Sequence, residues 1–390
     1  MFEQIIYLLI LLFIGYIILF LRRKAKGGKS LYKIALILLG IVLATVFSEI
    51  FDSDFLKSVS IVLLIVILFE LSSRLTPNNT TLSNKSLVLF SAIIFANMVL
   101  ITIISHNIIG LSIINSIILG IMISTIEYFM VSELKEEGDM SSPFLLVMTV
   151  LTITFIEVTT NDFFGIIEFI KYLVIGLGTG IIFGIIVFKS IKSHAHNVNW
   201  VHELGLVCAA IIIYIIAEYI NGSGIIAVLV FGIFFGNSYV KKRTEINGLS
   251  PFIFKSTETL ILLLLGFLIT THFSISLLWK TAIVFLAYII IRLTIISIAY
   301  KRHSFHNRLL LTFAPKGIVF AISMLVIAQY AIIENNLLDA MFIILIISLL
   351  CASFFEYIEY KKIAYFDRVY EVLKKIRFGR KRDLWKNWKK

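Results

Sequence analysis

The sequence predicts an all-α protein that crosses a membrane many times. Of its 390 residues, 59% are hydrophobic and only 15% are charged, and the mean hydropathy is +0.99. A water-soluble protein of this length would carry far more charge. The apolar residues gather in runs that are long enough to span a bilayer as helices. We therefore expect a polytopic membrane protein with about thirteen transmembrane helices.

The spans are placed by the apolar runs between polar connections. They lie near residues 3–21, 33–50, 57–73, 86–104, 109–132, 143–165, 169–190, 203–220, 223–240, 250–270, 275–299, 309–332 and 336–358. The first run has no basic residue before it and is long enough to cross a bilayer. We expect it to be a retained span and not a cleaved signal peptide.

Positive charge predicts the orientation of these spans. With the N-terminus outside, the inner connections and the C-terminal segment hold thirty Lys and Arg residues, and the outer connections hold three. Residues 361–390 alone contain twelve basic and three acidic residues. We expect a multi-pass protein of the cell membrane whose basic tail is cytoplasmic and contacts lipid, with no nucleic-acid partner.

Thirteen spans divide into two groups of six around a central one. The second group begins on the opposite side of the membrane from the first, as an inverted repeat requires. Its fifth span contains Pro315, Lys316 and Gly317. Pro315 removes a backbone donor and Gly317 frees the local dihedrals, so the helix should be interrupted there. The equivalent span of the first group lacks a proline, which makes a break there less well supported.

Polar residues cluster inside the run 143–165. Ionisable groups at membrane depth are costly unless they face a wet cavity or a partner. Glu157 and Asn161 are four residues apart and share a helix face, whereas Asp162 points about 140° away from Glu157. One carboxylate can then be neutralised by a neighbouring helix while the other faces an ion path.

Together these residues resemble the cation/proton antiporter superfamily, which includes the sodium/proton antiporters. Five patches carry the resemblance: Glu157-Val-Thr-Thr160-Asn161-Asp162, Ala314-Pro315-Lys316-Gly317, the small-residue stretch 223–237, Arg292 one span before the Pro-Lys-Gly break, and Leu68-Phe69-Glu70. The resemblance covers roughly residues 60–358.

The resemblance implies an architecture. The fold would contain inverted six-helix repeats with crossed discontinuous helices. Residues 1–360 would form the transmembrane antiporter domain, with core helices at about 86–165 and 275–358 and interface helices elsewhere, followed by the basic tail 361–390. Relatives are commonly homodimers, so a homodimer is also expected.

The resemblance also assigns roles to residues. Asp162 would carry the cation or the proton, and Asn161 is typical of electroneutral members. Glu157 would pair with Arg292 in a structural ion pair, with Glu127 as the second candidate partner. Glu70 would be a core acid or an outer-shell residue of the ion site.

Oxygen ligands suit sodium and lithium, which are hard cations. The candidate ligands are Asp162, Asn161, Thr160, Ser124 and Glu127 with the carbonyls near it, so the only metal we expect is the transported ion, held by Asp162. We expect Lys316 to stabilise the helix break. The family's Thr-Asp-Pro in the fifth span is replaced by Ile126-Glu127-Tyr128, and its serine after the first glutamate is Val158. These departures put the identity of the cation in doubt more than the mechanism.

The sequence bears on three classes of function. The leading expectation is electroneutral exchange of sodium, or lithium, for protons by alternating access, with potassium or another cation as the alternative. An intramembrane enzyme is disfavoured, because the sequence shows no nucleophile–base pair and no His-Glu-x-x-His helix. A non-transporting sensor or scaffold is the third class. No cofactor is expected beside the transported cation and the proton.

Overall fold

The computed structural model describes most of the helical part of the 390-residue chain. The described residues are 29–47, 53–73, 84–124, 150–151, 153–154, 166–194, 201–239, 250–268, 274–299, 312, 316, 318–328, 334–355 and 357. Every regular element within these ranges is a helix. This confirms the all-α class.

The helices follow the apolar runs of the sequence. They are α2 (Lys29–Phe47), α3 (Ser53–Ser73), α4 (Asn84–Ile109), α5 (Ile113–Ser124), α8 (Ile166–His194), α9 (Val201–Tyr219), α10 (Gly224–Tyr239), α11 (Ser250–Leu268), α12 (Ile275–Ala299) and α14 (Ile318–Ile327). A further apolar helix, Asn335–Phe355, follows α14.

The boundary between α4 and α5 differs from the predicted one. The apolar runs placed the end of one span near residue 104 and the start of the next at 109, but α4 continues to Ile109 and α5 begins at Ile113. Gly110 has φ +85°, and its N–H donates to the His106 carbonyl at 3.2 Å. A glycine in the left-handed region is a common helix terminator. Hydropathy alone missed it, because the last turn of α4 is partly polar.

By length and composition, three of the helices within the described ranges can each cross a bilayer. They are Ile167–Lys189, Ile275–Ser297 and Asn335–Phe355. Other apolar helices are shorter in their described parts, for example Ile113–Ser124 and Gly224–Gly236. The predicted number of thirteen spans extends over residues outside the described ranges.

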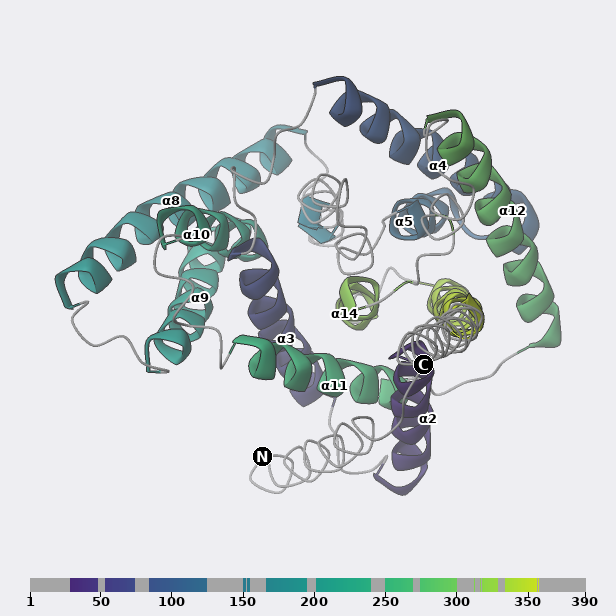
Figure 1. Ribbon diagram of the computed structural model, residues 1–390, viewed down its shortest axis with the longest axis horizontal. Coiled ribbons are helices and arrows are strands. Elements are labelled where there is room, and N and C mark those ends of the chain that lie inside the picture. The colour runs from purple at the N-terminus through teal and green to yellow at the C-terminus, as the bar shows by residue number, and fades with distance from the viewer. Residues whose placement is uncertain are drawn as a thin grey trace, which may run out of the picture.

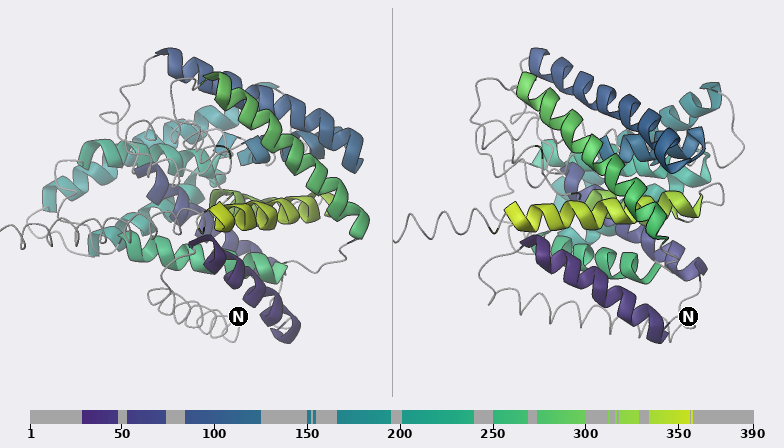
Figure 2. Two further views of the ribbon diagram at one scale, coloured as in Figure 1. Left: turned by 45° about the vertical axis from the view of Figure 1, so that its right-hand side comes forward. Right: turned by 90° about the vertical axis from the view of Figure 1, so that its right-hand side faces the viewer.

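The helices form a centre and a rim (Figure 1). We call α5, α14 and Asn335–Phe355 the central helices, because the other labelled helices surround them in this view. Eight of the twelve residues of α5 are buried. Helices α4 and α12 pack along one edge, where Figure 2 shows them running together, and α8, α9 and α10 form the opposite side. Helices α2, α3 and α11 close the remaining side.

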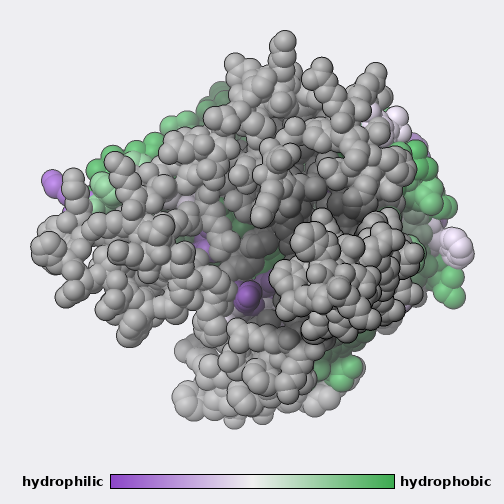
Figure 3. Space-filling model, in the orientation of Figure 1, coloured by the Kyte–Doolittle hydropathy of each residue, from purple (hydrophilic) through white to green (hydrophobic). Residues whose placement is uncertain are grey.

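The rim presents aliphatic and aromatic side chains outward. Ile167 on α8 is 82% exposed and Trp279 on α12 is 67% exposed. Hydrophobic residues lie along the outer margin of the molecule in Figure 3. Such a surface suits lipid and not water, as expected for a membrane protein.

Close approaches between helices explain the small-residue stretch 223–237. A Cβ at Gly236 would lie 3.1 Å from the Ser73 Cα, and one at Gly232 would lie 3.1 Å from the Phe69 carbonyl oxygen. Both glycines therefore let α10 approach the backbone of α3. Association of helices in lipid depends on such close packing, because lipid tails are as apolar as leucine side chains.

Candidate functional site

Three large polar side chains are buried beside the central helices. Tyr288 and Arg292 lie on α12, and Lys316 lies just before α14; their exposed fractions are 2%, 1% and 2%. Tyr288 and Arg292 are four residues apart, so they share one face of α12. Two permanent or near-permanent positive charges in one buried region are costly unless other groups stabilise them.

Arg292 interacts with the tyrosine one turn before it. Its Nη1 donates a hydrogen bond to the Tyr288 hydroxyl oxygen, and its guanidinium carbon lies 5.5 Å from the centre of the Tyr288 ring. In the described part of the chain, the Nε and Nη2 atoms of Arg292 have no hydrogen-bond partner. A guanidinium stays charged, so these donors call for an anionic partner.

The predicted partners of Arg292 lie outside the described residues. Both Glu157 and the alternative Glu127 belong to stretches that the structure does not describe. The ion pair therefore stays a prediction, and the two open donors of Arg292 are the groups that it would use.

The helix interruption is visible at Lys316. Thr312 is helical, the backbone at Lys316 is not, and α14 begins at Ile318. The backbone N–H of Lys316 donates to the Ser348 hydroxyl at 3.1 Å, and this hydroxyl donates to the Leu345 carbonyl at 2.9 Å. The helix Asn335–Phe355 thus satisfies a backbone donor at the interruption, as buried irregular backbone requires.

The Lys316 side chain reaches a second central helix. Its Nζ donates to the carbonyl of Ile123 in the last turn of α5, and it lies 4.9 Å from the centre of the Tyr288 ring. Carbonyls at a helix C-terminus carry partial negative charge and favour a cation. The ammonium therefore stabilises the described end of α5. The predicted role of Lys316 at the interruption before α14 stays a prediction.

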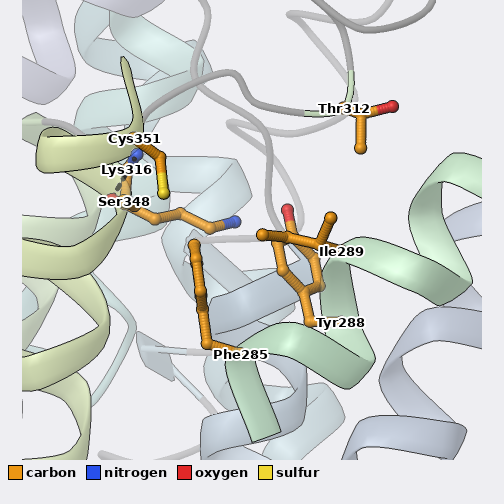
Figure 4. Close-up of a pocket in the computed structure, with 7 residues that line it drawn as sticks. All are labelled: Phe285, Tyr288, Ile289, Thr312, Lys316, Ser348 and Cys351. Atoms are coloured by element: carbon orange, nitrogen blue, oxygen red, sulfur yellow. Dashed lines mark hydrogen bonds between the residues drawn. The ribbon is translucent and has the colours of Figure 1, made fainter. Parts of the chain in front are cut away.

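A small cavity borders this contact (Figure 4). Its empty volume is about 220 Å³, and it is lined by Phe285, Tyr288, Ile289, Thr312, Lys316, Ser348 and Cys351. The Lys316 side chain extends across it towards the two aromatic rings of α12. The cavity thus lies between α12, the helix interruption and the helix Asn335–Phe355.

Ser124 is the one predicted cation ligand that the structure describes. It is the last residue of α5, it is buried, and its hydroxyl donates to the Gly120 carbonyl at 2.6 Å. It directly follows Ile123, whose carbonyl accepts from Lys316. The structure therefore brings the Lys316 ammonium close to the backbone beside one predicted ligand.

Of the other predicted site residues, the structure describes Glu70, and the rest lie outside the described ranges. Glu70 is half-buried on α3, which packs against α14, and its role stays a prediction. The residues outside the described ranges are Glu127, Glu157, Thr160, Asn161, Asp162, Pro315 and Gly317. Within the described ranges, no group of three or more His, Cys, Asp or Glu residues is arranged to hold a metal ion.

Sequence reasoning missed Tyr288. The spacing of four residues places Tyr288 on the helix face of Arg292, but its contact with Lys316 is a tertiary relation that the sequence does not show. It also missed four buried polar atoms without a hydrogen-bond partner in the described part of the chain: Asn97 Oδ1 and Thr102 Oγ1 on α4, Asn115 Oδ1 on α5 and Thr281 Oγ1 on α12. Single polar residues in apolar runs give no hint of which face they occupy.

A many-helix membrane fold with buried charges at an interrupted helix is typical of secondary transporters. The family described as "Sodium/hydrogen exchanger, transmembrane" matches this chain over residues 8–356. The chain belongs to this family, and its family and fold are those of a multi-pass membrane transporter and not of an enzyme.

Solved structures show the same fold. The chain is similar to the sodium proton antiporter MjNhaP1 from Methanocaldococcus jannaschii at pH 8, with 17% identity, a TM-score of 0.69, and 90% of this chain and 96% of that chain covered. An electron-microscopy structure of the same antiporter has 17% identity, a TM-score of 0.64, and coverages of 91% and 95%. The comparison with curated proteins finds no significant match.

Proposed function

We propose that the protein exchanges sodium for protons across the cell membrane by alternating access, with one cation moved per proton. The observation that carries the proposal is the family match over residues 8–356. The buried Arg292 and Lys316 at an interrupted helix support it, because charges at membrane depth mark ion pathways. Lithium is the second expected substrate, since it is also a hard cation.

The exchange step assigns the central role to Asp162. A carboxylate facing a wet cavity binds a proton or a cation, and either one neutralises the same charge. Oxygens of Thr160, Asn161, Ser124 and Glu127 would complete the cation's coordination. When the site faces one side and then the other, the two fluxes are coupled without chemistry.

In this proposal, the side chains of Lys316 and Arg292 supply the fixed positive charges of the site. Lys316 holds the end of α5 through the Ile123 carbonyl. Arg292 has two donors that suit a carboxylate, and we assign them to Glu157. The fixed ion pair would leave Asp162 as the group that changes its occupant.

Exchange by purified protein in vesicles tests this function. We would trap a pH-sensitive dye inside proteoliposomes and add sodium, lithium or potassium outside. Sodium added outside should alkalinise the lumen, because sodium enters as protons leave, and Asp162→Asn should abolish this response while the protein remains folded. Normal exchange by Asp162→Asn would remove the site assignment, and a wild-type protein inert to every cation would remove the function and favour a sensor or scaffold.

The same vesicles test cation identity and stoichiometry. Potassium exchange in place of sodium exchange is the alternative that Ile126, Glu127 and Val158 favour. One-to-one exchange moves no net charge, so an imposed membrane potential should leave the rate unchanged. A rate that follows the potential would contradict the role given to Asn161.

The arrangement in the membrane completes the proposal. We place the N-terminus outside and the basic tail 361–390 in the cytoplasm against lipid, and we expect a homodimer. Thirty basic residues on one side against three on the other support the orientation. Cysteine labelling on intact cells tests it. A single cysteine introduced near the N-terminus of the protein should react with an impermeant reagent, and one introduced near the C-terminus should not.

A further inference from the structure

We propose that Tyr288 is a positioning residue of the exchange site, whose ring holds the Lys316 ammonium against the end of α5. The inference rests on the proposed cation exchange and adds a residue to it. Tyr288 lies on α12, Lys316 lies at the helix interruption, and Ile123 lies on α5. The Lys316 side chain connects these three parts of the site, and the Tyr288 ring packs against its ammonium.

The contacts of the Tyr288 ring carry the first step of the argument. The Lys316 Nζ lies 4.9 Å from the ring centre, and the Arg292 guanidinium carbon lies 5.5 Å from it. Both distances fall within the range in which a ring attracts a cation, and the attraction grows when water is excluded. All three side chains are at least 98% buried.

The ring itself is held in place. Phe285 packs on it with 5.9 Å between ring centres and an angle of 38°. At the other end, the hydroxyl oxygen accepts a hydrogen bond from Arg292. A buried tyrosine anchored at both ends has little rotamer freedom, so it can fix the position of a flexible lysine.

The position of Lys316 matters for the ion site through α5. Its ammonium binds the Ile123 carbonyl, and the next residue, Ser124, is a proposed cation ligand. Without the ring, the lysine would lose one of the groups that compensate its buried charge and would shift. A small displacement of a group that orients ligands is enough to weaken binding severalfold.

The experiment compares two substitutions at Tyr288 with one at a distant tyrosine. Tyr288→Leu removes the ring and the hydroxyl, and Tyr288→Phe removes only the hydroxyl. The matched control is Tyr32→Leu, because Tyr32 is also a buried helical tyrosine, whose hydroxyl shares a hydrogen bond of 3.0 Å with Thr259 between α2 and α11. Each variant is assayed in proteoliposomes for the KM for sodium and for kcat.

The inference predicts that the KM for sodium depends on the presence of an aromatic ring at position 288. Tyr288→Leu should raise KM by about threefold to tenfold, the effect of one cation–ring contact, with a smaller change in kcat. Tyr288→Phe should keep KM close to the wild-type value, and Tyr32→Leu should change stability alone. These results would support a positioning role and not a structural one.

Several outcomes would overturn the inference. Wild-type KM in a folded Tyr288→Leu protein would do so, as would an increase in KM in Tyr32→Leu of the same size. If Tyr288→Leu does not fold, Tyr288→Met replaces it, because the flexible methionine also removes the ring and fills more of the same space; a wild-type KM in folded Tyr288→Met would overturn the assignment. A wild-type protein without exchange would instead contradict the proposed function, so the two failures are distinguishable.

Discussion

The central helices and the rim have almost the same apolar composition, but they differ in how much of their surface is buried within the protein. The most hydrophobic stretch of α8 is 22% buried within the protein, whereas that of Asn335–Phe355 is 56% buried. Both are long apolar helices, and hydropathy does not separate them. The difference lies in the few polar groups, since Lys316 and Ser348 meet in the centre while the rim presents isoleucine and tryptophan.

This comparison shows how a membrane protein specifies its interior. In water, burial of apolar surface decides which helices lie inside. In lipid that driving force is absent between helices, so close packing and polar contacts must decide it. The centre holds the buried charge of Lys316 and its hydrogen bonds. The rim combines glycines that admit a neighbouring backbone with polar contacts such as those of Tyr32 with Thr259 and Lys33 with Glu258.

The largest effect on stability is expected from Arg292→Ala. If Arg292 pairs with Glu157, its removal leaves a buried carboxylate without compensation, at a cost of about 3–5 kcal/mol. The thermal unfolding temperature in detergent should fall strongly. Lys280→Ala on the same helix is the control, because Lys280 is exposed and should tolerate the change. A melting temperature equal to that of the wild type would contradict the ion pair.

A smaller effect is expected at the rim from Gly180→Ala. A Cβ at Gly180 would lie 2.5 Å from the Ala227 carbonyl oxygen and 2.9 Å from the Val230 Cβ, so α8 and α10 must separate. Overpacking of this kind costs about 1–3 kcal/mol. The matched control is Gly178→Ala on the same helix, because a Cβ there meets no atom within 4 Å. Equal melting temperatures for the two variants would show that α8 does not depend on this contact.

The smallest effect is a pH dependence at Glu334, which lies before the helix Asn335–Phe355. Slight burial raises the pKa of its carboxyl, but hydrogen bonds from the Asn115 side chain and from the Ser112 side chain and N–H outweigh this and leave the pKa below its ordinary value of 4.5. One of these is the Ser112 N–H donating to Glu334 Oε1 at 3.2 Å. The contact joins the start of α5 to another central helix.

A carboxyl whose pKa is lower in the folded state stabilises that state at pH values above its unfolded-state pKa. This stabilisation is lost as the pH falls through the folded-state pKa. The contribution of Glu334 should therefore be complete at neutral pH, should begin to fall near pH 4.5, and should be lost as the pH passes below the lowered pKa of its carboxyl. Because the carboxylate is largely solvated, we expect less than about 1 kcal/mol. Melting curves of wild type and Glu334→Gln should differ at pH 7 and converge at low pH. A constant difference across this range would contradict the role of the charge.

Much of the fold follows from the sequence because lipid imposes a simple rule. Every backbone group must be satisfied within the membrane, so a long apolar run becomes a helix. The range 275–299 was predicted with the bounds that α12 has, and Ser274 caps it by accepting from the Leu277 N–H at 3.1 Å. The start of α5 was missed because Gly110 ends α4 by backbone conformation, which hydropathy does not report.

The candidate site was predictable only in part. Charged residues in apolar runs marked Arg292 and Lys316 directly, since such residues are costly in lipid. Tyr288 carried no such mark, because tyrosine is common in membrane helices as an interfacial residue. Its importance depends on the contact of α12 with the helix interruption, which is a tertiary relation. The roles assigned to Glu157 and Asp162 stay predictions.

The bond from Lys316 to Ile123 has a consequence for motion. A single ammonium joins the interruption before α14 to the end of α5, and Ser348 joins the same interruption to Asn335–Phe355. In the alternating access proposed above, we expect these three segments to move as one rigid body. The surface along which this body moves would then consist of apolar side chains, so the movement would break few hydrogen bonds. The rate of the movement should therefore depend on the size of those side chains.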